Sequence, residues 1–161
     1  MQASNLRKIT PWVDMGHCQV SVFFDFLQVA IGNRKSLSVS IADADWHRLF
    51  EFCKRQALIG IGYAAVERVH EVGVECPSAI RLKWYGYALQ IERMNEKLNM
   101  QCGEIAKRYE HDGLQCCILK GQGNCLNYPE SFRMRRTPGD IDVLTVPFEN
   151  EVSSNLEIIS Q

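Results

Sequence analysis

The stretch from 118 to 146, ILKGQGNCLNYPESFRMRRTPGDIDVLTV, decides how the whole chain is interpreted. Its last part, Ile141 to Val146, is short, apolar and rich in β-branched side chains, which predicts a buried strand. Pro138-Gly139 opens this strand and Pro147 closes it, because both prolines break regular structure. The charged and polar residues around this strand are the candidates for a functional site.

Two acids, Asp140 and Asp142, flank Ile141 in this stretch. Residues two apart on a strand share a face, so we expect both carboxylates to project together while Ile141 and Val143 face the core. Paired carboxylates repel each other and are costly to desolvate. A hard cation, Mg²⁺ or Mn²⁺, relieves both costs because it prefers oxygen ligands. The pattern predicts a metal site, and its plain alternative is a pair of solvated acids at a strand end.

A glycine-containing turn precedes the acids. Cys116 to Leu119 is a short apolar run that predicts a strand ending at Lys120, and Asn124 to Tyr128 suits a brief helix. A strand–turn–helix unit binds anions, since the first N–H groups of a helix lack partners and lie at the positive end of its dipole. We expect Gly121 and Gln122 to offer backbone N–H groups to a phosphate, and Lys120 to add a positive charge.

Together these residues resemble a bacterial family of nucleotidyltransferases in the polymerase-β-like superfamily. The resemblance is carried by Leu119-Lys120-Gly121, Tyr128-Pro129, Arg136 and Gly139 to Val143. It implies a small mixed sheet in which the turn holds a nucleoside triphosphate and the acids hold the metal ion for attack on the α-phosphate. Lys120 and Arg136 would neutralise the charge of the transfer. The nucleoside monophosphate would pass to an unknown acceptor: a protein hydroxyl, a small molecule or an RNA end.

The chain departs from that superfamily in one respect. The superfamily carries a third catalytic carboxylate on a later strand, whereas this chain ends at Gln161 and offers Glu157 as a poor match. We therefore expect the front part of a longer protein or a truncated relative. Two alternatives stay open. One is a nucleotide- or metal-binding module without catalysis, and the other is a helical interaction module whose acids pair with Arg133, Arg135 or Arg136.

The residues upstream predict helices. The apolar run Val20 to Ile31 favours a buried helix, although so short a run also permits a strand. Apolar residues at helical spacing predict three more helices, from Trp46 to Ala57, Tyr63 to Val72 and Ala79 to Tyr109. Ser40 or Asp43 is the expected N-cap of the first of these three. Residues 1–19 are expected to be irregular.

The expected fold class is α+β. A mainly helical region, residues 1–112, leads into a partial nucleotidyltransferase-like core, residues 113–161, with a small mixed sheet. Two strands alone do not make a stable sheet, so helices must cover it. A second copy of the chain pairing with an open sheet edge is an expected partner.

The composition limits the classes of function. Hydrophobic residues make up 46% and charged residues 23% of the chain, as in an ordinary globular protein. The net charge of −1 argues against general nucleic-acid binding. Seven cysteines without a C-x-x-C pair predict reduced thiols and a cytoplasmic location. No apolar run reaches the ~18 residues of a membrane-spanning helix.

Overall fold

The structure is a computed structural model that describes residues 17–147, so the tail with Glu157 and all but the last three residues of the segment expected to be irregular, 1–19, lie outside it. Those three residues, 17–19, are helical, which corrects the expectation for them. The described chain combines helices with a small sheet, which confirms the α+β class. It divides into two compact units, one ending at Trp84 and the other beginning at Tyr85. This division falls inside the longest helix, whereas the expected boundary at 112/113 coincides with the end of that helix.

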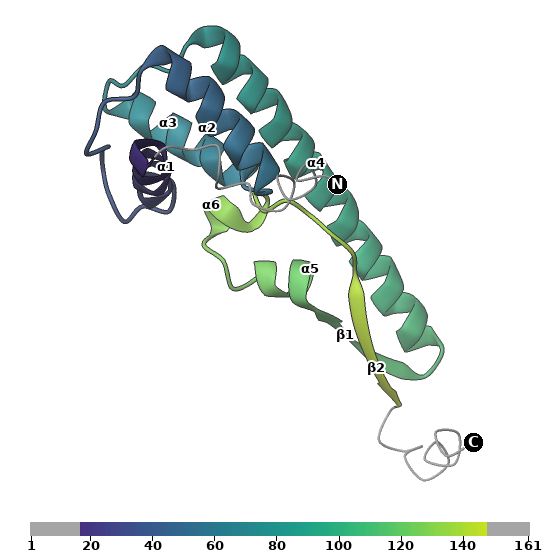
Figure 1. The fold of residues 1–161 in the computed structure, drawn as a ribbon. Coiled ribbons are helices and arrows are strands. Elements are labelled where there is room, and N and C mark those ends of the chain that lie inside the picture. Colours follow the sequence, from purple (N-terminus) through teal and green to yellow (C-terminus); the bar gives the residue numbers. More distant parts are fainter. Residues whose placement is uncertain (1–16, 148–161) are drawn as a thin grey trace, which may run out of the picture. The chain divides into compact units, whose positions relative to one another are not determined.

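Helices alone build the first unit (Figure 1). They are α1 (His17–Ala30), α2 (Asp43–Arg55), α3 (Ile59–Glu71) and the first turns of α4 (Ser78–His111). The run from Val20 is thus a helix and not a strand. Neither expected N-cap is correct, because Ala42 precedes α2 and makes no side-chain cap, while Asp43 is already the first helical residue.

Aromatic rings form the core of the first unit. Trp84 is fully buried, and its Nε1–H donates to the carbonyl oxygen of Ile59 at 2.8 Å. Its ring lies 5.6 Å from that of Phe26 and 5.5 Å from that of Phe50, measured between centroids. Because Ile59 opens α3 and Phe50 belongs to α2, one tryptophan joins the four helices of this unit. It therefore acts as a core anchor.

A glycine of α3 makes this packing possible. A Cβ atom added at Gly62 would lie 2.7 Å from Cζ2 of Trp84 and 2.8 Å from Sγ of Cys53. Both distances are too short for real side chains, so the indole ring occupies the space that any other residue would need. Gly62 therefore allows α3 to approach the tryptophan closely.

We predict that Gly62→Ala lowers the free energy of unfolding of the first unit by about 1–3 kcal/mol, the usual cost of overpacking a core. Urea unfolding followed by tryptophan fluorescence would measure it. Gly86→Ala is the matched control, because a Cβ there meets no atom within 4 Å. That control should be neutral or stabilising, by up to about 1 kcal/mol, since alanine favours helices. Equal destabilisation by the two substitutions would contradict the packing role of Gly62.

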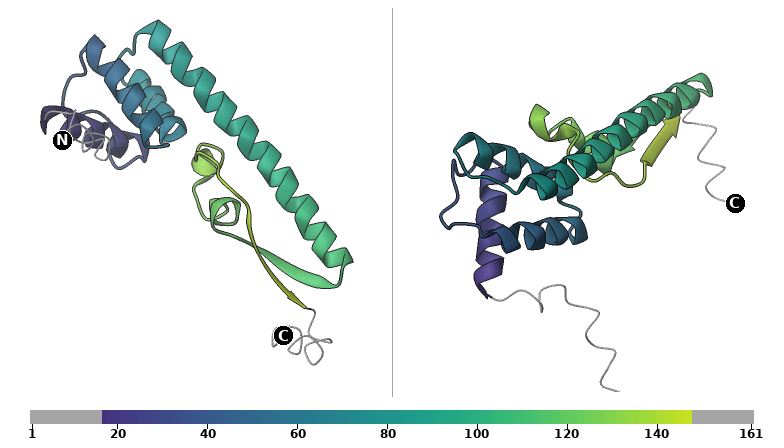
Figure 2. Two further views of the ribbon diagram at one scale, coloured as in Figure 1. Left: turned by 45° about the vertical axis from the view of Figure 1, so that its right-hand side comes forward. Right: turned by 90° about the horizontal axis from the view of Figure 1, so that it is seen from above.

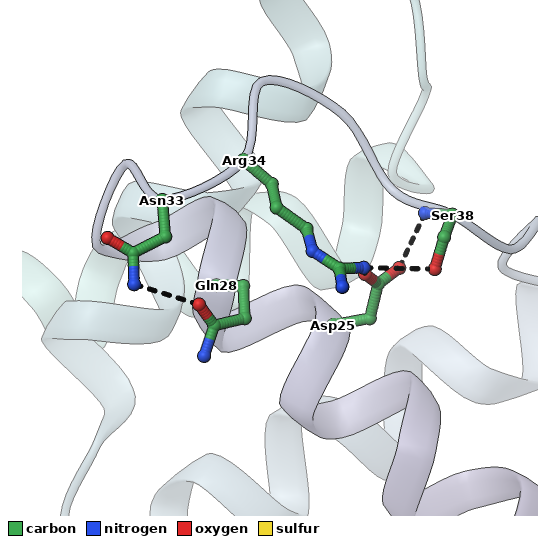
Figure 3. A network of polar contacts seen from close by, with 5 residues as sticks. All are labelled: Asp25, Gln28, Asn33, Arg34 and Ser38. Carbon is green, nitrogen blue, oxygen red and sulfur yellow. Dashed lines mark hydrogen bonds and ion pairs between the residues drawn. The ribbon is translucent and has the colours of Figure 1, made fainter.

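The loop after α1 is tied to the helix by a buried carboxylate (Figure 3). Asp25 accepts hydrogen bonds from the Arg34 guanidinium and, at 2.6 Å, from the backbone N–H of Ser38. Burial by itself raises the pKa of Asp25, but the bonds from Ser38 and Arg34 outweigh burial and lower the pKa below its ordinary value. Next to this network, the Asn33 side-chain amide donates to Gln28 at 2.9 Å.

A lowered pKa makes the contribution of Asp25 to stability dependent on pH. The contribution is complete above the unfolded pKa, near 3.8, and is lost as the pH falls through the folded value. We predict that Asp25→Asn destabilises the first unit by about 1–3 kcal/mol at pH 7. The difference from the wild type should be smaller at a pH below the lowered pKa of folded Asp25, where the carboxyl is protonated, than at pH 7. Urea unfolding midpoints at both pH values would measure it, and a constant difference would contradict the prediction.

The second unit combines the remainder of α4 with the sheet and two short helices (Figures 1 and 2). These elements are β1 (Leu114–Leu119), α5 (Lys120–Cys125), α6 (Glu130–Arg133) and β2 (Asp142–Pro147). The strands pair antiparallel, and within the described residues they form the whole sheet. The brief helix predicted from Asn124 is misplaced, because α5 begins at Lys120 and α6 was not expected.

The second strand differs from its prediction in extent and burial. It begins at Asp142, so Asp140 and Ile141 precede it. Leu144 and Val146 are 53% and 46% exposed, which corrects the expectation of a buried strand. The reason lies in the register, which places Leu144 opposite Cys117 and Val146 opposite Gln115, residues of the exposed face of β1. We call this surface, formed by Gln115, Cys117, Leu119, Asp142, Leu144 and Val146, the outer face of the sheet.

Pairing through the sheet edge with a second copy of the chain stays a prediction. In the described part of the chain, no helix is at once long enough and apolar enough to cross a membrane.

Candidate active site

The register of the sheet brings the two sequence motifs together. Antiparallel pairing places Leu119, the last residue of β1, opposite Asp142, the first residue of β2. The turn that follows Leu119 therefore lies beside the acids that precede and open β2. The two motifs, far apart in the sequence, lie side by side because β1 ends where the turn begins and β2 begins at the second acid.

The closest contact between the motifs is an ion pair. Lys120 Nζ lies 2.9 Å from Oδ2 of Asp142, whose side chain is 33% exposed. The hydrogen bond and charge of Asp142 raise the pKa of Lys120, and the charge of Asp140 adds a smaller increase. Both acids thus act on one ammonium group. The pair of carboxylates creates a place where a cation is favoured, which is the property that a metal site requires.

The turn has an unusual backbone. Lys120 has φ = 47° and Gly121 has φ = 25°, so two successive residues adopt positive φ. This region is unfavourable for a residue with a Cβ atom, and strained backbone of this kind is concentrated at functional sites. The conformation lets the chain turn sharply from β1 into α5 and aims the Lys120 side chain at Asp142.

Gly123 secures the other side of the turn. A Cβ atom added there would lie 2.1 Å from the carbonyl oxygen of Ile118 and 3.1 Å from its carbonyl carbon. Backbone atoms cannot move aside as the end of a side chain can. The backbone of α5 therefore packs directly on the backbone of β1 at Gly123, where no side chain fits. The sequence pattern included this glycine in the turn but did not reveal that the approach to Ile118 requires it.

We predict that Gly123→Ala opens the turn and destabilises the second unit by at least about 1–3 kcal/mol, the cost of overpacking. Hydrogen exchange of the β1 amides would detect the change as lost protection. Gly139→Ala serves as the control in the same segment of sequence, because a Cβ there meets no atom within 4 Å. Unchanged protection of β1 in Gly123→Ala would contradict this account.

Arg136 approaches the turn from the segment before the acids. A Cβ atom added at Gly121 would lie 3.6 Å from the Asp140 carbonyl oxygen and 3.7 Å from Nη1 of Arg136. That Nη1 atom is buried and has no hydrogen-bond acceptor among the described residues. A buried charged donor without a partner costs at least about 1–3 kcal/mol. An anionic oxygen beside Gly121 would remove this cost, so the geometry suits a phosphate.

The other predicted site residues are placed as follows. Gln122 turns its side chain inward, where Nε2 donates to Oδ1 of Asn99 at 2.6 Å, so its backbone rather than its amide remains near the turn. Asp140 is exposed in the segment just before β2. The site therefore brings together five of the predicted residues: Lys120, Gly121, Arg136, Asp140 and Asp142. Gln122 attaches the turn to α4 through Asn99.

The arginines are not the partners of the acids. Arg135 lies 3.8 Å from Glu92, and Nε of Arg133 donates to the carbonyl oxygen of Tyr128 at 3.1 Å. Among the described residues, no arginine forms an ion pair with Asp140 or Asp142, and the partner of Asp142 is Lys120. The interaction-module alternative, which relied on such arginine pairs, loses this support.

The two carboxylates suit a magnesium ion but do not fill its coordination shell by themselves. In residues 17–147, no three carboxylate, imidazole or thiol side chains cluster closely enough to hold a metal ion. Magnesium keeps several waters and is commonly held by one or two carboxylates together with substrate phosphates. Asp140 and Asp142 can supply the carboxylates, and a triphosphate at Gly121 can supply the phosphate oxygens.

Sequence patterns assigned no site role to one important residue, Asn95. It is fully buried on α4, and its Nδ2 donates to the carbonyl oxygens of Met134 and Arg136 at 2.9 and 2.8 Å. The signal was present, because Asn95 occupies the position of the apolar stripe between Ile91 and Leu98 where another apolar residue is expected. A polar residue at such a position indicates a buried hydrogen bond.

Comparison with known protein families gives a match. The sequence profile of a family described as uncharacterised nucleotidyltransferase matches residues 42–149, more than half of the chain. The match includes every residue placed at the site above. No curated protein and no solved structure shows significant similarity to the chain. On the strength of the family match, the chain belongs to the family of uncharacterised nucleotidyltransferases.

Proposed function

We propose that this chain binds Mg²⁺ and a nucleoside triphosphate at the junction of β1 and β2, and transfers the nucleoside monophosphate to an acceptor. One observation carries the proposal: the register puts Lys120, Gly121 and Arg136 beside the carboxylate pair. Anion-binding and cation-binding groups thus meet at one place, as a metal-bound triphosphate requires. The acceptor is a hydroxyl of a protein, a small molecule or an RNA end.

Each residue has a distinct task in this proposal. Asp140 and Asp142 hold the metal ion, which would supply charge neutralisation for the phosphates and the attacking oxygen. Gly121 allows a phosphate to approach the backbone, and the unpaired Nη1 of Arg136 donates to it. Lys120 neutralises Asp142 in the free chain. It can release Asp142 to the metal ion and turn to a phosphate, because its side chain is 71% exposed.

The reaction exchanges a phosphoanhydride bond for a phosphoester bond. The acceptor oxygen forms a bond to the α-phosphorus, and the bond from that phosphorus to the bridging oxygen of the β-phosphate breaks. Pyrophosphate leaves with the bonding electrons, and the acceptor proton passes to a base. Charge accumulates on the phosphate oxygens during transfer, so fixed positive groups beside them lower the barrier.

We predict that Mg²⁺ with one of ATP, GTP, CTP or UTP raises the melting temperature of the chain. A ligand at a hundred times its dissociation constant stabilises the native state by about 2.7 kcal/mol. A thermal-shift panel with each nucleotide, with and without Mg²⁺, would measure the response. The double variant Asp140→Asn/Asp142→Asn should lose it. The proposal is abandoned if the folded wild-type chain responds to none of the four nucleotides.

Two further variants sharpen the panel. Lys120→Met should weaken the nucleotide response and strengthen the response to Mg²⁺ alone, because it frees Asp142 from its ion pair. Asp112→Asn is the matched acid control, since Asp112 follows α4 and is not among the residues of the site. A response that Asp112→Asn abolishes as well would indicate a general charge effect rather than a site.

Binding without turnover is the second candidate. The observations at the site, the unpaired Nη1 of Arg136 beside Gly121 and the two carboxylates near Lys120, support binding and do not bear on transfer. Release of pyrophosphate distinguishes the two candidates. Release in the presence of Mg²⁺ that disappears in Asp140→Asn/Asp142→Asn supports transfer, whereas saturable binding without release supports the binding module.

A further inference from the structure

Helix α4 presents a buried amide in the middle of an apolar stripe. Ala88, Ile91 and Cys102 are buried on this stripe of the second unit, and Asn95 between them is 0% exposed. Burial of an amide is unfavourable unless hydrogen bonds replace those to water. The bonds that Nδ2 of Asn95 makes offset part of this cost, whereas Oδ1 is buried without a hydrogen-bond donor among the described residues.

Those bonds hold the segment that carries Arg136. Nδ2 of Asn95 lies 2.8 Å from the Arg136 carbonyl oxygen, 2.9 Å from that of Met134 and 3.1 Å from that of Ile91. Three carbonyl oxygens surround one nitrogen, which fixes the orientation of the amide, because an oxygen in its place would face three acceptors. Asn95 thus fastens the backbone of residues 134–136, which we call the arginine loop, to α4.

A second amide, one turn further along α4, attaches residues 120–123, which we call the glycine turn, to the helix. Oδ1 of Asn99 accepts a hydrogen bond from Nε2 of Gln122 at 2.6 Å, and Nδ2 of Asn99 lies 3.7 Å from Sδ of Met134. Residues four apart share a face of a helix, so Asn95 and Asn99 project together. The arginine loop and the glycine turn are therefore attached to one face of one rigid helix.

We propose that Asn95 and Asn99 are positioning residues for the nucleotide site. By holding the arginine loop and the glycine turn at a fixed separation, α4 keeps the buried Nη1 of Arg136 beside Gly121. The inference rests on the proposed function in so far as it concerns nucleotide affinity. Its structural content, the attachment of the arginine loop through Asn95, stands on the hydrogen bonds alone. The two parts have separate tests.

The first test measures the loop without any ligand. Brief trypsin treatment of the full chain, with fragment ends identified by mass spectrometry, reports access to the bonds after Arg133, Arg135 and Arg136. Asn95→Ala should speed cleavage there several-fold relative to cleavage after Arg55, which lies in the first unit. Asn95→Asp, which keeps the side-chain volume but loses the N–H donors, should do the same.

Control variants separate attachment of the loop from general unfolding. Gln90→Ala changes an exposed residue of the same helix and should leave cleavage as in the wild type. Faster cleavage at all basic sites, including Arg55, would show that Asn95 only stabilises the fold. Wild-type cleavage of the arginine loop in both Asn95 variants would overturn the attachment.

The second test measures nucleotide affinity by calorimetry at a temperature where each variant is folded by circular dichroism. Asn95→Asp should weaken binding of the magnesium–nucleotide complex by about 10- to 100-fold, the usual effect of removing a residue that orients binding groups. Asn99→Ala, at an exposed position, should have a smaller effect in the same direction. Unchanged affinity in both variants would overturn the positioning role. A wild-type chain without nucleotide affinity would refute the proposed function, and the trypsin result would then decide the attachment alone.

Discussion

The pairing of Leu119 with Asp142 is the constraint on which the site depends. A shift of one residue in this register would turn Asp142 to the opposite face of the sheet, because side chains alternate along a strand. Lys120 would then lose its ion-pair partner, and the turn would no longer lie beside the acids. The hydrogen bonds of Asn95 add a second constraint at the arginine loop, so that the site is fixed both from the sheet and from α4.

The site holds two groups in unfavourable states. Lys120 has positive φ, and Nη1 of Arg136 is buried without an acceptor among the described residues. Both features cost free energy of folding. An anionic oxygen beside Gly121 would offset the cost at Arg136, whereas the ion pair of Lys120 with Asp142 is favourable in the free chain. In the first unit, by contrast, the buried carboxylate of Asp25 is fully paired and only fastens a loop.

The sequence predicted the elements that follow from periodicity and from local breaks. Apolar spacing identified the helices around Trp46 and Trp84, and the resemblance at Leu119-Lys120-Gly121 and Gly139 to Val143 identified the family. It did not predict where α5 begins, because that depends on the positive φ of Lys120 and on the approach of Gly123 to Ile118. Burial of β2 was overestimated, since apolar composition does not say how many strands flank a strand. The ion pair of Lys120 with Asp142 depended on the register, which no local pattern encodes.

The outer face of the sheet also has a practical consequence for spectroscopy. Among the six cysteines whose side chains are described, Cys117 alone is exposed, and it lies opposite Leu144 on that face. Burial raises the pKa of Cys53 to about 12 and is the main reason that the pKa of Cys76 rises to about 11, so these thiols are poorly reactive at neutral pH. A maleimide fluorophore should therefore couple to Cys117 ahead of them. Its emission would report on the surroundings of the outer face, a few residues from the glycine turn.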